Sequence, residues 1–183
     1  MDTLVTYLVA AMTAWVPAKA HPESPEETAS RYESIARDVV SVAFDEAEKP
    51  LFAGSDGRIQ TALFMLSIAS YESSYKKVVD EGAGRGDGGR SYCLMQIRVG
   101  DGRTREGWTG NQLVADRKLC FRAALHILHG SFNVCHNLPV EDRMSAYATG
   151  HCFEHASVSR SRIYRARAWW HKHAPPAATV LDS

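Results

Sequence analysis

The sequence lacks an excess of charge of either sign. Its 21 Lys and Arg residues balance 21 Asp and Glu residues, which excludes a strongly basic or acidic chain. With 45% hydrophobic and 23% charged residues, the composition is typical of a globular domain. The balance hides an asymmetry, because residues 1–50 carry a charge of −5 and residues 51–183 carry +5. A mildly basic body favours an anionic polymer as partner.

Cysteine is missing from the first half of the chain, and no two cysteines form a close C-x-x-C pair. Cys93, Cys120, Cys135 and Cys152 are an even set, which is typical of two disulfides formed in an oxidising compartment. Sequence alone leaves three pairings open, and the simplest joins Cys93 to Cys120 and Cys135 to Cys152. Buried free thiols are one alternative. A zinc site is another, because histidines lie nearby at His126, His129, His136, His151 and His155.

Long hydrophobic runs are missing too. Residues 4–16 form an uncharged, mostly apolar run of 13 residues, whereas a helix needs about 20 to cross a bilayer. Asp2 and the lack of an early Lys or Arg argue against a secretion signal, although residues 18–20 resemble a signal-peptidase site. We expect a packed helix that ends at Pro17, with one apolar stripe formed by Leu4, Leu8, Met12 and Trp15. Residues 1–16 are also a candidate contact with a membrane or a virion.

Internal repeats and low-complexity tracts are absent, so helical spacing and turn signals define the organisation. Ser24, Pro25 and Glu27 predict a helix start with a capping box. Helical spacing predicts helices over 25–49, 55–75, 113–129, 140–149 and 157–173. Five glycines at 82–91 predict a loop, Cys93–Val99 a strand, and residues 100–110 a second loop. The expected fold is mainly α, with six or more helices and a small β-hairpin.

Three units follow from this organisation. Residues 1–23 are expected to be an apolar helix with a linker, residues 24–176 one catalytic domain, and residues 177–183 a flexible tail.

Glu72 is the first candidate for chemistry. It lies near the end of the most apolar predicted helix, about ten residues before the glycine-rich loop. A carboxyl group half-buried among apolar side chains keeps its proton more readily, as an acid catalyst requires. The alternative is an ordinary surface glutamate on a last helical turn.

Three short motifs in order give Glu72 a context. They are Glu72-Ser73-Ser74-Tyr75, Leu94-Met95-Gln96-Ile97 and Ala146-Tyr147-Ala148-Thr149-Gly150. Together, over about residues 55–152, they resemble motifs of soluble lytic transglycosylases and goose-type lysozymes, which belong to the lysozyme-like superfamily. The resemblance implies a lysozyme-like α+β fold, with the hairpin beside the active-site cleft. It also implies cleavage of the β-1,4 bond between N-acetylmuramic acid and N-acetylglucosamine in peptidoglycan.

The resemblance also assigns roles to individual residues. Glu72 matches the catalytic acid and Ser73 its helical neighbour. In the second motif, Met95, Gln96 and Ile97 match substrate-binding positions, and the Gln amide can hydrogen-bond an N-acetyl group. Tyr147 matches an aromatic residue that approaches the acid and the scissile sugar. Met95 and Tyr147 could instead be packing residues.

This sequence departs from the family pattern at three places. Cys93 stands where Gly precedes the second motif, and Ala148-Thr149 stands where Asn-Ala is common. An Asn that often begins the family's next helix is not found at residues 116–119. These departures affect the sugar subsites more than the acid.

The sequence leaves two chemical routes open. A lysozyme of the inverting type needs a second carboxylate to hold water, and Asp87 in the glycine-rich loop is the candidate. Goose-type lysozymes tend to carry an Asp directly after the second motif, where this chain has Arg98 and where Asp101 is the nearest acid. A lytic transglycosylase needs no such partner, so the sequence favours that route. The alternative for Asp87 is a turn residue.

The last predicted helix is rich in arginine and tryptophan. We expect an amphipathic helix with Ile163, Tyr164 and Trp170 directed inward, rather than a nucleic-acid surface. Its outward residues are expected to be Arg162, Arg165 and Arg167.

The sequence thus predicts a monomeric enzyme that acts on peptidoglycan glycan strands in the bacterial cell envelope. It is expected to use no cofactor, to bind no metal and to bind no nucleic acid. A bacteriophage endolysin or virion component fits, as does a secreted wall-remodelling enzyme. The rival from another class is a non-catalytic glycan-binding or virion structural protein of lysozyme fold.

Overall fold

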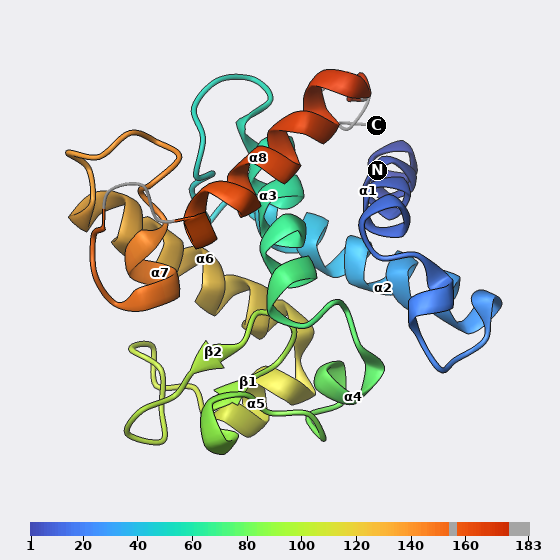
Figure 1. Cartoon of the computed structure of the whole chain (residues 1–183), viewed down its shortest axis with the longest axis horizontal. Coiled ribbons are helices and arrows are strands. Elements are labelled where there is room, and N and C mark those ends of the chain that lie inside the picture. The colour runs from blue at the N-terminus through green and yellow to red at the C-terminus, as the bar shows by residue number, and fades with distance from the viewer. Residues whose placement is uncertain (154–156, 176–183) are drawn as a thin grey trace.

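The computed structural model describes residues 1–153 and 157–175, which form eight α-helices and one small sheet (Figure 1). The helices are α1 (Asp2–Trp15), α2 (Pro25–Ala43), α3 (Gly57–Glu72), α4 (Lys77–Asp80), α5 (Gly110–Ala115), α6 (Arg117–Val134), α7 (Ser145–Thr149) and α8 (Ser157–Lys172). The sheet pairs β1 (Ser91–Tyr92) with β2 (Ile97–Arg98) in antiparallel register. The predicted mainly α fold with a small β-hairpin is confirmed. The tail predicted at 177–183 lies outside the described residues.

Helix α3 is the centre of the fold. It lies in the middle of Figure 1 and contacts α1, α2, α6 and α8. Its side chains are buried on every side from Thr61 to Ser70, as its uniformly apolar sequence predicts. The helix leaves the core at its C-terminal end, so Glu72 lies where the buried helix meets solvent.

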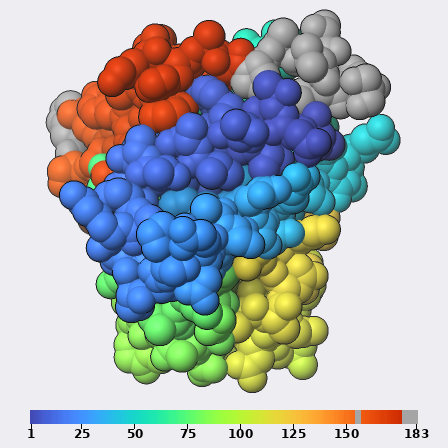
Figure 2. Space-filling model, turned by 90° about the vertical axis from the view of Figure 1, so that its right-hand side faces the viewer, coloured from blue at the N-terminus to red at the C-terminus, as the bar shows by residue number. Residues whose placement is uncertain are grey.

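The N-terminal helix belongs to the same core. Leu4, Leu8 and Met12 are fully buried, as predicted, and Trp15 is partly buried. Helix α1 packs on α2 and α3, and Figure 2 shows it running across one face of the molecule beside α8. Trp169 of α8 makes an edge contact with Trp15 at a ring distance of 6.2 Å. Within the described residues, no helix has the length and apolar character needed to span a bilayer.

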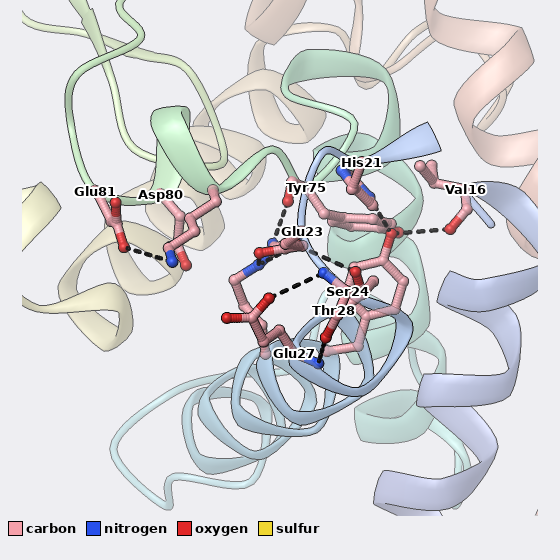
Figure 3. Close-up of polar contacts among 12 residues, drawn as sticks. Val16, His21, Glu23, Ser24, Glu27, Thr28, Tyr75, Asp80 and Glu81 are labelled. Carbon is pink, nitrogen blue, oxygen red and sulfur yellow. Dashed lines mark hydrogen bonds and ion pairs between the residues drawn. The ribbon is translucent and has the colours of Figure 1, made fainter. Parts of the chain in front are cut away.

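Polar contacts fix the start of α2 and the turn after α3 (Figure 3). The predicted capping box is present, because the Ser24 and Glu27 side chains each accept a bond from the other's backbone amide. Arg31 donates to the carbonyl oxygen of Tyr75. The Tyr75 hydroxyl donates to the Leu66 carbonyl at 2.8 Å, within α3. These bonds hold the chain that directly follows Glu72.

Both predicted disulfides are present. Cys93–Cys120 joins the hairpin turn to α6, and Cys135–Cys152 joins the end of α6 to the segment after α7. The alternative of buried free thiols is therefore wrong. Each bridge ties another segment of the chain to the long helix α6 or its end. The small sheet and the short helices by themselves would hold these segments only weakly.

Several predicted bounds are wrong, for local reasons. The helix predicted over 113–129 is two helices, because Asp116 ends α5 and its carboxylate caps α6 by accepting from the Lys118 amide at 2.9 Å. The helix predicted over 140–149 is helical only in α7, since the residues before it form turns. The strand predicted at 93–99 is mostly the turn between β1 and β2. The helices predicted over 25–49 and 55–75 also end early, α2 at Ala43 and α3 at Glu72.

Candidate active site

A cleft of about 580 Å³ lies at the C-terminal end of α3. Glu72 lines it with a side chain that is 21% exposed, so its carboxyl group is reachable but largely shielded. The other lining residues come from the glycine-rich loop and hairpin, from α6 and from α7: Asp87, Ser91, Gln96, Ile97, Arg98, Ile127, Ala146, Tyr147, Ala148, Thr149 and Gly150. The structure therefore brings Glu72, Asp87, Gln96, Ile97 and Tyr147 together from three separate parts of the chain.

Backbone strain is concentrated around this cleft. Within residues 1–153 and 157–175, five non-glycine residues have positive φ: Ser74, Tyr75, Asp87, Cys93 and Gln96. The first two directly follow Glu72, and the other three lie in the loop and hairpin beside it. Such conformations cost about 1–3 kcal/mol each and tend to collect at functional sites. The Cys93–Cys120 disulfide, the buried Tyr75 side chain and the hydrogen bond from Ser91 to Asp87 lie at these positions.

Gln96 fastens the glycine-rich loop to the hairpin. Its Oε1 accepts from the Gly86 amide at 3.0 Å, and its Nε2 donates to the Cys93 carbonyl at 3.0 Å. A Cβ atom at Gly86 would lie 2.4 Å from that Oε1, so a larger residue there would push the Gln96 amide aside and break this bond. Each end of the Gln96 amide keeps capacity for one further bond. The predicted sugar-binding glutamine thus also positions the loop that carries Asp87.

Asp87 begins a single 3₁₀ turn, Asp87–Gly89, inside the glycine-rich loop. Its Oδ2 accepts a bond from the Ser91 hydroxyl at 2.6 Å, which directs the carboxyl group toward β1 and the cleft. Asp87 is therefore a turn residue and also a cleft residue.

Tyr147 closes the cleft from α7. Its hydroxyl donates to the Met95 carbonyl at 2.7 Å, which ties α7 to the hairpin. Burial, and next the negative charge of Glu72, hold the pKa of the Tyr147 hydroxyl well above its usual range. Tyr147 is thus a neutral hydrogen-bond donor at all ordinary pH values. The effect of the Glu72 charge on its pKa places the two side chains near each other.

Two residues assigned to substrate binding lie in the interior instead. The Met95 side chain is fully buried in the core, and only its carbonyl takes part in the site, through Tyr147. Ser73 is 5% exposed, and its hydroxyl bonds within its own turn, to the Ala69 carbonyl and the Tyr75 amide. Both shape the cleft through packing and turn geometry.

Arg162 of α8 is the site residue that sequence reasoning missed. Its Nη2 donates to Glu72 Oε1 at 2.7 Å, and its Nη1 donates to the Val158 carbonyl at 2.6 Å. The predicted outward direction of Arg162 is wrong, since the residue is 8% exposed. Tyr164, predicted to be inward, is 51% exposed, whereas Ile163 is buried as predicted. Helical spacing could have predicted the inward direction of Arg162, because this residue shares a face of α8 with buried Ser159 and Ala166.

No group of three or more potential metal ligands occurs among residues 1–153 and 157–175. His126 lies between the carboxylates of Glu48 and Glu106, and His129 bonds the Lys49 carbonyl. His155 lies outside the described residues. Because all four cysteines form disulfides, none of them can supply a thiolate ligand to zinc.

The described part of the chain is thus a disulfide-linked, mainly helical domain whose cleft is lined by two carboxyl groups, an arginine, an amide and a tyrosine. Such a set can donate and accept protons and can hydrogen-bond a polar, uncharged polymer. Comparison of the chain with known protein families, with curated proteins and with solved structures finds no match.

Proposed function

We propose that this protein cleaves the β-1,4 bond between N-acetylmuramic acid and N-acetylglucosamine in peptidoglycan, with Glu72 as the acid. The observation that carries the proposal is the cleft itself. The cleft brings Glu72, at the end of a buried helix, together with Gln96 and Tyr147 from two distant segments. Gln96 and Tyr147 are the residues that the family resemblance pairs with the acid. The two disulfides suit work in an oxidising envelope.

The chemistry begins with proton transfer. Glu72 donates its proton to the glycosidic oxygen as the bond from that oxygen to the muramic C1 breaks, and the resulting carboxylate then serves as base. In a lytic transglycosylase it takes the proton of the muramic 6-hydroxyl, whose oxygen attacks C1 and closes a 1,6-anhydro ring. In a lysozyme a water molecule attacks instead.

The transglycosylase route is the first candidate. Arg98, which stands where goose-type lysozymes tend to have a carboxylate, lines the cleft. A guanidinium cannot act as the base that activates water, so Glu72 would carry both proton transfers.

Hydrolysis is the second candidate, and the placement of Asp87 favours it. Its carboxyl group lines the same cleft as Glu72 and is oriented by Ser91. A carboxylate so placed can hold a water molecule for attack on C1.

Product analysis separates the two routes. If Glu72 works alone, digested peptidoglycan should carry anhydromuramic ends, lighter by one water than hydrolysed ends, and Asp87→Asn should retain activity within about threefold. If Asp87 activates water, products should have reducing ends and Asp87→Asn should cost about 10²-fold or more. Mass spectrometry and a reducing-sugar assay measure both. Asp101→Asn is the matched control, because Asp101 does not line the cleft.

The Arg162 ion pair adds a requirement. Arg162 occupies Oε1 of the Glu72 carboxyl group, whereas an acid catalyst must direct its carboxyl group at the leaving oxygen of the substrate. Bound glycan would therefore have to approach the other carboxyl oxygen of Glu72, Oε2, while Arg162 holds Oε1. In the free protein, Arg162 fixes the direction of the Glu72 side chain.

Arg162→Met should lower kcat by about tenfold or more, because small displacements of a reacting group cost rate steeply. Loss of charged hydrogen bonds should also lower the free energy of unfolding by about 1–3 kcal/mol. Arg165→Met is the matched control. Arg165 stacks on the Tyr71 ring, as Arg162 does, but bonds Ser70 rather than Glu72. Equal loss of kcat in both variants would contradict the role given to Arg162.

The rival of another class is a glycan-binding or virion structural protein without activity. It predicts binding of peptidoglycan with no change in the mass of the glycan strands, so the product analysis also tests it.

A further inference from the structure

A second hollow adjoins the cleft at β2. We call it the basic groove, and it has a volume of about 600 Å³. Its lining residues are Ile97, Arg98, Arg103, Thr104, Arg105, Glu106, His126, Ile127 and Gly130. Ile97, Arg98 and Ile127 line the cleft as well, so the two hollows share one wall.

Charge distinguishes the basic groove. Three arginines line it against a single acid, Glu106, which is already engaged with His126 Nδ1 at 3.0 Å. Within residues 1–153 and 157–175, Arg98, Arg103 and Arg105 form no ion pair, and all three are exposed. Elsewhere on this protein, arginines such as Arg37, Arg117 and Arg122 are paired with carboxylates.

The loop that presents these arginines is held in place. Arg103 Nη1 donates to the Gly107 carbonyl at 2.7 Å, and the Thr104 amide donates to the Trp108 carbonyl at 2.7 Å. The Trp108 ring stacks on His126 of α6 at 6.3 Å. Guanidinium groups that form no ion pair and lie together at one concave site are suited to carboxylates, which they bind through paired hydrogen bonds.

We propose that the basic groove binds the acidic stem peptide that peptidoglycan carries on its muramic acid residues. This inference rests on the proposed function, because glycan in the cleft would bring the peptide of a neighbouring sugar to the shared wall. The groove would then make the enzyme prefer peptide-bearing strands over bare glycan.

The test compares cleavage of glycan strands with intact stem peptides and strands stripped of peptides by an amidase. The wild type should show a higher kcat/KM on the peptide-bearing strands. In Arg103→Gln/Arg105→Gln this preference should fall about three- to tenfold, which is the effect of losing two exposed charge contacts. Arg98 is left unchanged because it also lines the cleft. Lys118→Gln/Lys172→Gln is the control, since both lysines are exposed and line neither hollow.

A binding experiment separates failure of this inference from failure of the proposed function. A soluble stem tripeptide with free carboxylates is titrated into the full chain, and the heat of binding is measured by calorimetry. Binding that the double arginine variant loses supports the groove even if no glycan is cut. Cleavage without preference for peptide-bearing strands and without tripeptide binding would overturn the groove alone. Tight, salt-dependent binding of duplex DNA in place of the peptide would also overturn it.

Discussion

Replacement of Glu72 by Gln is expected to lower peptidoglycan cleavage by about 10²–10⁴-fold, the usual contribution of general acid catalysis. Gln has the size of Glu, and its amide oxygen can still accept the bond from Arg162. It has no proton to transfer to a leaving oxygen. The variant should therefore fold normally, with a melting temperature within a few degrees of the wild type, and should still bind glycan.

The measurements are release of soluble fragments from purified walls and thermal denaturation. Glu81→Gln is the control, because the Glu81 side chain is 62% exposed and does not line the cleft. It loses the same charge and should keep full activity. A folded Glu72→Gln protein with activity within a few-fold of the wild type would remove Glu72 from the mechanism. The cleft would then fit the glycan-binding alternative better.

Loss of the disulfides is expected to give the largest change in stability. Bridges that close loops of 27 and 17 residues restrict the unfolded chain and should each contribute about 3–4 kcal/mol. For a chain of this length, Cys93→Ala/Cys120→Ala and Cys135→Ala/Cys152→Ala should each lower the melting temperature by about 5–15 °C. The first pair should also reduce activity, because Cys93–Cys120 supports the turn that contains Gln96.

Thermal denaturation with and without a reducing agent measures the effect. The variant with all four cysteines replaced by Ala is the control, since reductant should not change its melting temperature. Alkylation of the unfolded, unreduced protein provides an independent check, with no modified cysteine expected. Four alkylated thiols would show that the bridges do not form in solution.

The candidate site was only partly predictable. Glu72 was found because α3 is apolar all round and ends beside a glycine-rich loop, which are local properties of the sequence. Gln96 and Tyr147 were found through motif order, which says that segments meet but not how their side chains bond. The inward Arg162 and the buried Met95 depend on how α8 and the hairpin rotate against α3.

The sequence by itself determined the features that arise from neighbouring residues. These include the capping box at Ser24, the buried central helix, the glycine-rich loop and the number of disulfides, because each depends on spacing along the chain. Only the tertiary structure decided the bond between Gln96 and Gly86, the Arg162–Glu72 pair and the groove beside the cleft. Such features depend on residues about 10 to 90 positions apart, and the packing of the whole core sets their relative positions.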